Sequence, residues 1–336
     1  MIKAFLKPIA IMLASLMLAG VAFTASIHKK GEDTSITTEP KEEIEEDVEA
    51  LKSTERPYSL LVLGRDATSG LTDVMMLVSF DKSQNKIFVL QLPRDTYVDY
   101  GASYYKLNGA LRSLGESGIC EMLEASMGIE LDGYISLELE GFRALVDSIG
   151  GVEMNIEKPL KYSDPSQGLY IDLPSGRQTL DGKHAEMLVR YRSGYARGDL
   201  DRLDVQKRFL AALFVTLKQK ITPFNIYSIA SAALLYLKTD VSASELVSLG
   251  LKLAFVDVSN VRLATIAGED ARSSISGGSF FVLSKDSAEE ILREYFSLDG
   301  EFDREGKFLH PSLENFRKIY YQRVENKIFS LEELKN

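Results

Sequence analysis

The sequence is poor in cysteine and histidine: it has one cysteine, Cys120, and three histidines, His28, His184 and His310. A single cysteine excludes an intramolecular disulfide, so the hydrophobic core must stabilise the fold. Cys120 has mostly apolar neighbours, which is typical of a small buried side chain and not of a nucleophile. With so few histidines, we expect neither a histidine-rich metal site nor a serine–histidine–aspartate hydrolase.

The chain also lacks an excess of positive charge, since its formal net charge is −10. A general nucleic-acid-binding protein carries a basic stripe or an elevated pI, so we expect no nucleic-acid partner. Apolar residues make up 45% of the 336 residues, which is enough for a substantial buried core.

The first 30 residues predict a membrane anchor. Lys3 and Lys7 precede an uncharged stretch of 20 residues from Pro8 to Ile27, the length at which a helix crosses the hydrocarbon core. The lysines favour a cytoplasmic N-terminus. A cleaved signal peptide is the alternative, although its apolar region is usually only roughly 7–15 residues long. We therefore expect a single-pass protein of the cell membrane, with residues 1–30 as cytoplasmic stub and anchor and the remainder extracellular.

Residues 31–57 form an acidic linker, because six carboxylates between Glu42 and Glu49 repel one another and extend the chain. Residues 58–296 alternate between strand-like and helix-like stretches, which predicts one α/β (αβα) domain with a central sheet flanked by helices. Residues 297–336 are charged, include an amphipathic stretch from Leu313 to Val324, and form a C-terminal extension of unknown role.

Apolar runs without alternation predict strands buried on both faces. Residues 157–180 contain three prolines and two glycines and are expected to form a long loop. Strands are expected at 58–63, 74–80, 86–92, 133–137, 152–156, 261–266 and 279–283. Helices are expected at 107–114, 118–127, 140–149, 199–220, 225–237, 243–254 and 286–296.

Two aspartates flank the loop between the first two strands. Asp66 follows the first strand and Asp73 begins the second. Because these strand ends are neighbours, the two carboxylates are placed to hold a hard divalent cation together with phosphate and water. Each aspartate alone is more typical of a turn or a cap.

Several arginines are placed to bind an anion. Pro93 ends the third strand and fixes the exit of Arg94 and Asp95, which alone would form a local ion pair. Arg190 and Arg192 follow an apolar stretch and, in an extended backbone, point to the same side. Two such guanidinium groups can bind phosphate oxygens in bidentate fashion.

A polar stripe of Asp199, Arg202 and Gln206 begins the long helix, where the helix N-terminus favours an anion. A solvent-facing stripe is the equal alternative. Lys106, at the start of a predicted helix, adds a further cation nearby, although a lysine at such a position is usually just solvated. Together these residues predict binding of a phosphate or diphosphate with Mg²⁺. Phosphoryl transfer requires such a set of cationic side chains and metal ligands.

The order of these motifs resembles the LytR–CpsA–Psr family. The match is dense over residues 58–220 and looser to about 296. It rests on the segments LVLGRD (61–66), LTDVMMLV (71–78), VLQLPRDT (89–96), KLN (106–108), 141–152, LDGKHA (180–185) and 189–206.

The resemblance implies a mixed sheet, an apolar pocket for a polyprenyl chain, and transfer of a phosphorylated glycopolymer from a polyprenyl-diphosphate carrier to peptidoglycan. It implies Mg²⁺ at the diphosphate, with Asp66 and Asp73 as ligands. Leu71 departs from the family, in which an arginine is common, and Arg65 is a candidate for the missing charge. The implied catalytic residues are Arg94, Asp95, Arg190 and Arg192, and the implied substrate-binding residues are Lys106, Asp199, Arg202 and Gln206.

Two other functions use the same residues: hydrolysis of the lipid diphosphate, and non-catalytic binding of the lipid by a regulator. A dinucleotide enzyme is excluded, because the segment from Gly64 to Gly70 lacks the glycine fingerprint. The polymer, the acceptor hydroxyl, the oligomeric state and the general base, with Asp66 and Asp95 as candidates, stay open.

Overall fold

The computed structural model describes residues 56–65, 70–101, 105–165, 168–221, 236–274, 277–309 and 316–334. The predicted anchor and Asp66 lie outside these ranges, as does most of the predicted linker. Within the described ranges, no helix has both the length and the apolar character needed to cross a membrane.

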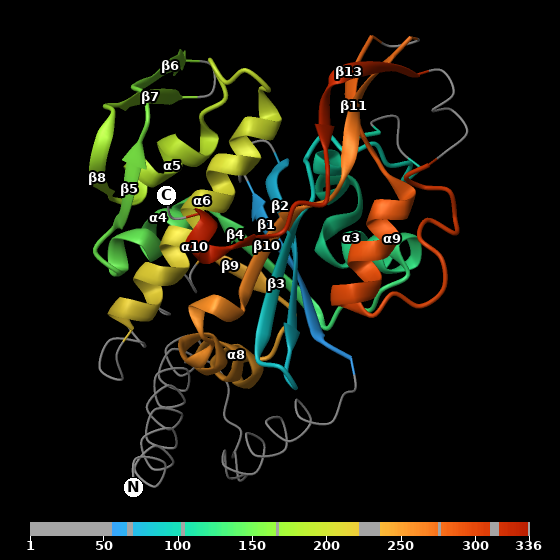
Figure 1. Ribbon diagram of the computed structural model, residues 1–336, viewed down its shortest axis with the longest axis horizontal. Coiled ribbons are helices and arrows are strands. Elements are labelled where there is room, and N and C mark those ends of the chain that lie inside the picture. The colour runs from blue at the N-terminus through green and yellow to red at the C-terminus, as the bar shows by residue number, and fades with distance from the viewer. Residues whose placement is uncertain are drawn as a thin grey trace, which may run out of the picture.

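A mixed sheet of seven strands forms the centre of the fold (Figure 1), which confirms the predicted fold class. β1 pairs parallel with β4 and β3 with β10, while the other neighbouring strands are antiparallel. In spatial order the strands are β14 (Phe329–Ser330), β10 (Val261–Thr265), β3 (Lys86–Gln91), β2 (Thr72–Asp81), β1 (Tyr58–Arg65), β4 (Gly133–Glu138) and β9 (Leu237–Thr239).

Helices cover both faces of this sheet. Alternate residues of a strand point to opposite faces, so Leu61 and Leu63 of β1 pack in one core while Leu60 packs in the other. The continuous apolar run of β1 follows from burial on both sides. The first core includes the short η1 (Leu107–Gly109), α3 (Ala110–Met127) and α9 (Lys285–Phe296); the second includes α6 (Asp199–Lys220), α8 (Ala243–Phe255) and α10 (Leu331–Leu334).

A third core lies beside the sheet, in the lobe at the left of Figure 1. Two antiparallel sheets of two strands each, β5-β8 and β6-β7, pack there against the helices, and they correct the prediction of a long loop over 157–180. Pro165, Gly168, Pro174 and Gly176 stand at the turns, and the intervening residues alternate between buried and exposed. The lobe contains α4 (Leu139–Ser148), β5 (Val152–Ile156), β6 (Leu160–Asp164), β7 (Leu169–Leu173), β8 (Gly176–Leu180) and α5 (Gly182–Arg190).

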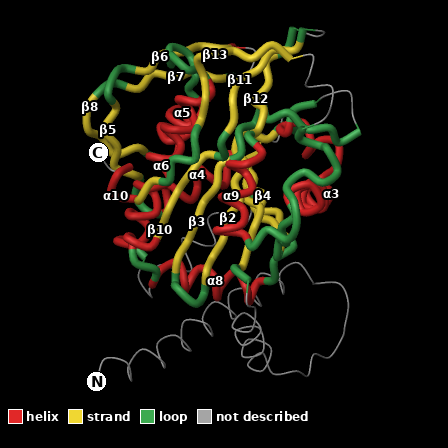
Figure 2. Tube along the Cα trace, turned by 45° about the vertical axis from the view of Figure 1, so that its right-hand side comes forward, coloured by secondary structure: helices red, strands yellow, loops and turns green. Residues whose placement is uncertain are grey.

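A three-stranded sheet stands on the opposite side, with strands in the order β12-β11-β13 (Figure 2). β11 (Gly268–Ser273) was not predicted, whereas β12 (Ser279–Leu283) was. β13 (Phe316–Val324) belongs to residues 297–336, the predicted C-terminal extension. That segment also supplies β14 to the central sheet and Phe302 and Phe308 to the first core. Its described part is therefore integral to the domain.

The remaining predictions agree with the structure at most positions. The helix predicted over 199–220 has the observed bounds of α6. The helix predicted over 225–237 lies almost entirely outside the described residues, and Leu237 begins a strand.

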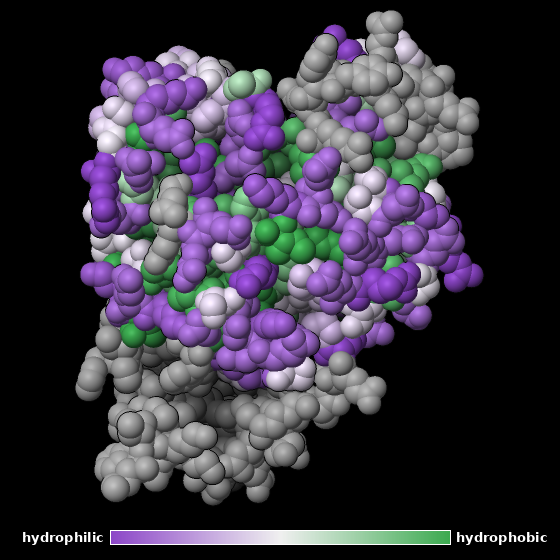
Figure 3. All heavy atoms as spheres, in the orientation of Figure 1, coloured by the Kyte–Doolittle hydropathy of each residue, from purple (hydrophilic) through white to green (hydrophobic). Residues whose placement is uncertain are grey.

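Figure 3 shows that hydrophilic residues cover most of the described surface on the face of Figure 1, with apolar residues visible mainly in its middle.

Candidate functional site

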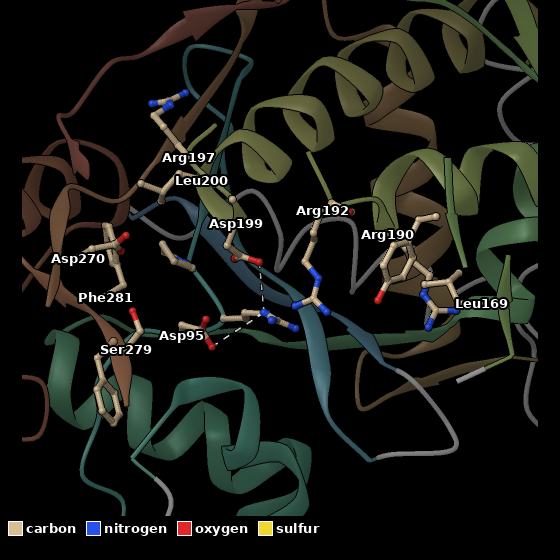
Figure 4. A pocket seen from close by; sticks show the side chains of 16 residues that line it. Asp95, Leu169, Arg190, Arg192, Arg197, Asp199, Leu200, Asp270, Ser279 and Phe281 are labelled. Atoms are coloured by element: carbon tan, nitrogen blue, oxygen red, sulfur yellow. Dashed lines mark ion pairs between the residues drawn. The ribbon is translucent and has the colours of Figure 1, made fainter. Parts of the chain in front are cut away.

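A cavity of about 480 Å³ lies between the lobe that contains β6 and β7 and the three-stranded sheet that contains β11 and β12 (Figure 4). Its walls come from the segment after β3, the β6–β7 hairpin, the connection between α5 and α6, and strands β11 and β12. Five of the predicted site residues line it, namely Arg94, Asp95, Arg190, Arg192 and Asp199. The fold therefore brings together motifs that are more than a hundred positions apart in the sequence.

Arg94 is at the centre of the charged network. Its Nη1 donates a hydrogen bond to Asp73 Oδ1 at 2.8 Å, and its Nε lies 3.3 Å from Asp199 Oδ1. Burial alone would lower the pKa of the Arg94 guanidinium, but Asp199 and Asp73 raise it above its ordinary value. Arg94 is thus a permanently charged donor whose orientation is fixed from two sides.

Arg202 lies beneath this pair, with only 1% of its side chain exposed. Its Nη2 is 3.0 Å from Asp199 Oδ1, and its Nη1 is 3.8 Å from Asp73 Oδ1. The polar stripe of α6 therefore faces inward, and the solvent-facing alternative is wrong. Gln206, also buried, donates from Nε2 to the Val189 carbonyl at 3.0 Å and so fixes the end of α5.

The two arginines after the apolar stretch adopt a different backbone from the predicted one. Arg190 is the last residue of α5 and pairs with Glu186 one turn earlier, at 2.9 Å. Arg190 is therefore helical and Tyr191 extended, so the prediction that Arg190 and Arg192 point to the same side of an extended strand is wrong. Arg192 is exposed and, among the described residues, has no carboxylate within ion-pair distance. Figure 4 shows it between Asp199 and Arg190 at the cavity.

Lys106 and Arg65 are both engaged with carboxylates. Lys106 Nζ lies 3.0 Å from Asp95 Oδ1, which links the helix start to the segment that follows β3. Arg65 pairs with Glu138 and lies 3.9 Å from Glu116, so it does not supply the charge that Leu71 lacks.

Several buried polar atoms of the site have no hydrogen-bond partner within the described part of the chain. Such atoms are costly unless a ligand satisfies them. An arginine Nε group is a donor and can bind an oxygen of a phosphate ester. Such atoms are Arg202 Nε and Gln206 Oε1, whereas Arg94 Nε and Asp199 Oδ1 lack a well-aligned hydrogen bond but lie 3.3 Å from each other as an ion pair.

Asp73 fits the role of a metal ligand. Burial would raise the pKa of its carboxyl, but Arg202 and Arg94 hold that pKa below its usual value. Both contacts use Oδ1, so Oδ2 is available to a hard cation. The described residues include no group of three or more acidic, histidine or cysteine side chains arranged around a metal, so an ion here would also need Asp66 or substrate oxygens.

The prediction missed the wall that β11 and β12 contribute. Asp270, Ser279 and Phe281 line the cavity there (Figure 4). β11 has the sequence GEDARS, in which only Ala271 is a buried apolar side chain. The hydrophobic periodicity of this segment is too weak to predict a strand, because pairing with β12 and β13 stabilises the strand.

The fold and the site define a mixed α/β protein with an arginine-lined cavity. The model of the LytR_cpsA_psr family matches residues 21–297. The chain belongs to this family, as its motifs predicted.

Named relatives extend this comparison. The chain is 33% identical over 164 residues to the polyisoprenyl-teichoic acid–peptidoglycan teichoic acid transferase TagU of Oceanobacillus iheyensis, which is 46% of this chain and 49% of that protein. It thus spans about half the length of TagU. It is 24% identical over 250 residues to the regulatory protein MsrR of Staphylococcus aureus, covering 72% of this chain and 75% of MsrR. The crystal structure of Bacillus subtilis TagV shares the fold, with a TM-score of 0.62 and 24% identity over 74% of this chain and all of that chain.

Proposed function

We propose that this chain transfers a phosphorylated glycopolymer from a polyprenyl-diphosphate carrier to peptidoglycan. The observation that carries the proposal is the convergence of Arg94, Arg190 and Arg192 on one cavity, with Arg202 buried behind them. The name of the relative TagU describes this class of reaction for teichoic acid. The polymer that this chain carries is left open, and teichoic acid and capsule are both candidates.

In the proposed reaction, a sugar hydroxyl of peptidoglycan attacks the glycan-proximal phosphorus of the lipid diphosphate. The bond from that phosphorus to the bridging oxygen breaks, and polyprenyl phosphate leaves. Arg94 and Arg192 donate hydrogen bonds to the phosphate oxygens on which negative charge grows. Asp73 and Asp199 orient Arg94 beforehand, so little reorganisation is needed during the reaction.

We further propose that Asp73 and Asp66 hold a Mg²⁺ ion together with substrate oxygens. The bound ion supplies positive charge that neutralises the diphosphate. The support is the ionised state of Asp73 and its available Oδ2.

Replacement Asp73→Asn is expected to weaken metal binding by tenfold or more, because the amide presents less negative charge to a hard cation. Binding of Mn²⁺ as a spectroscopic substitute for Mg²⁺, in the presence of a non-reacting diphosphate analogue, measures this without turnover. Asp172→Asn is the matched control, since Asp172 is exposed on β7 and pairs with Lys161. An unchanged Mn²⁺ affinity in the Asp73 variant would remove this residue from the metal site.

Residues 1–30 are proposed to anchor the chain in the cell membrane, with the N-terminus cytoplasmic and the domain extracellular. The support is the uncharged 20-residue stretch and the lysines before it. Protease added to intact cells should digest the domain and spare a tag at the N-terminus; protection of the domain would reverse this topology.

The function is tested with the full chain in detergent, a short-chain polyprenyl-diphosphate disaccharide, peptidoglycan oligomers and Mg²⁺. Mass spectrometry should detect a glycan joined to peptidoglycan through one phosphate. Free glycan phosphate, with or without acceptor, would instead identify a hydrolase. Lipid that is bound but unaltered would identify a regulator, the class that the name of MsrR describes.

A further inference from the structure

A carboxylate outside the arginine network lines the cavity from the β11 side. Asp270 belongs to β11 and was not expected at the site. In Figure 4, Asp270, Ser279 and Phe281 lie on one side of the cavity and Arg190 and Leu169 on the other. Arg192, Asp199 and Asp95 lie between them, so Asp270 faces the site from the end opposite Arg190.

Backbone hydrogen bonds fix the position of Asp270 relative to Arg94. Asp270 pairs in register with Phe281 of β12. The Phe281 N–H donates to the Asp95 carbonyl at 2.9 Å, and its carbonyl accepts from the Tyr97 N–H at 2.8 Å. β11 is therefore tied through β12 to the segment that carries Arg94 and Asp95. Such a connection holds a reacting group in place better than a loop does.

The other carboxylates of the cavity already serve as partners of cations. Asp95 is held by Lys106 at 3.0 Å, and Asp199 by Arg202 at 3.0 Å. The side chains of Asp95 and Asp199 are therefore engaged in positioning a lysine and an arginine. In the described part of the chain, Asp270 has neither an ion pair within 4 Å nor a side-chain hydrogen bond. Asp270 is the stronger candidate.

The surroundings of Asp270 suit it to proton transfer near neutral pH. Burial, followed by repulsion from Asp95 and Asp199, raises the pKa of the Asp270 carboxyl to about 6, and Lys106 opposes this only in part. At neutral pH the group is mostly ionised, yet it is more basic than an exposed aspartate. Proton transfer is most efficient when the pKa of the base is close to the working pH.

We propose that Asp270 is the base that accepts the proton of the attacking hydroxyl, an inference that rests on the proposed transfer reaction. The hydroxyl oxygen forms a bond to the glycan-proximal phosphorus while its proton passes to an Asp270 carboxylate oxygen. The bond to the bridging oxygen breaks, and its electron pair leaves with polyprenyl phosphate. Asp270 then releases the proton to solvent. The acceptor sugar enters from the β11–β12 side, and the arginines hold the phosphate from the other sides.

The test replaces Asp270 by asparagine, which has the same shape but cannot accept the proton. Turnover of the full chain with the short-chain lipid diphosphate and peptidoglycan oligomers should fall by about 10²- to 10⁴-fold, with lipid affinity unchanged. Glu269→Gln is the matched control. Glu269 is the neighbouring carboxylate on β11, and unlike Asp270 it does not line the cavity. This variant should keep the rate of the wild type.

The pH profile separates a base from a merely structural residue. In the wild type, kcat/KM should be level above about pH 6 and fall roughly tenfold per unit below it, because only the ionised carboxylate accepts a proton. The residual rate of Asp270→Asn should lack this fall, and Asp270→Glu should restore part of the rate.

The outcomes are distinguishable. If the wild type transfers glycan and Asp270→Asn does so within threefold of its rate, the base is another group while the transferase stands. If the wild type only hydrolyses the lipid, the transfer function fails, and the same variant then decides whether Asp270 activates water. A wild type that is inert with both acceptors overturns the proposed function and this inference together.

Discussion

Replacement of Arg94 by alanine is expected to lower kcat by about a thousandfold or more. An arginine that stabilises charge in phosphoryl transfer contributes about 10³- to 10⁵-fold to kcat. Arg94 is held for this purpose by Asp73 at 2.8 Å and by Asp199 at 3.3 Å. Its removal also leaves these two carboxylates with less opposing charge, which repels the anionic substrate.

The measurement is the initial rate of the mass-spectrometric transfer assay at saturating lipid. Arg177→Ala is the matched control, because Arg177 is 80% exposed on β8 and pairs only with the exposed Glu153 among the described residues. Circular dichroism checks that both variants fold. A kcat within tenfold of the wild type for Arg94→Ala would mean that the phosphate is bound elsewhere.

Replacement of Arg202 by alanine is expected to be the most destabilising change in the site. Its side chain is 1% exposed and lies within 4 Å of both Asp199 and Asp73. Removing one partner of a buried ion pair typically costs about 3–5 kcal/mol. Asp199 and Asp73 keep Arg94 as a partner, but they lose the buried cation, and the truncated side chain leaves a cavity. For a domain of this size we expect Tm to fall by roughly 6 °C or more.

Arg197→Ala serves as the comparison for stability. Arg197 lies nearby and pairs with Asp201 and Asp204, but 44% of its side chain is exposed. Exposed pairs contribute only about 0–1 kcal/mol, so the Tm should change little. Equal Tm values for the two variants in thermal denaturation would show that burial of Arg202 does not stabilise the fold.

The central strands and the long helix were predictable because their signals are strong. β1 to β3 are apolar runs, and α6 combines an apolar face with acidic residues in its first turn and lysines in its last. The charged residues that follow β3 and begin α6 then fall at the site, since α/β folds place sites at strand ends.

The end of α5 was mispredicted because a short apolar run fits a strand and a helix equally well. The missed signal is Asp181, whose side chain accepts a hydrogen bond from the His184 N–H at 2.8 Å and caps the start of α5. An N-cap at Asp181 predicts a helix that starts at Gly182 and includes Arg190.

The β11 wall, including Asp270, had no comparable signal. Its strand depends on partners at 279–283 and 316–324, and such long-range pairing leaves little trace in local sequence. The hairpin β6–β7 could not be predicted for a related reason: prolines and glycines are typical of a loop, but here they stand at the ends of short strands.

The pairing of β14 with β10 and of β13 with β11 has a consequence for solubility. Strand edges without a partner present free N–H and C=O groups on which another chain can add a strand. The last part of the chain covers one edge of the central sheet and one edge of the side sheet. β14 and β13 become the outer strands in their place, and β14, with only two residues, presents a much shorter edge on the central sheet than the five residues of β10 would. This segment therefore limits strand addition at that edge as well as completing the core.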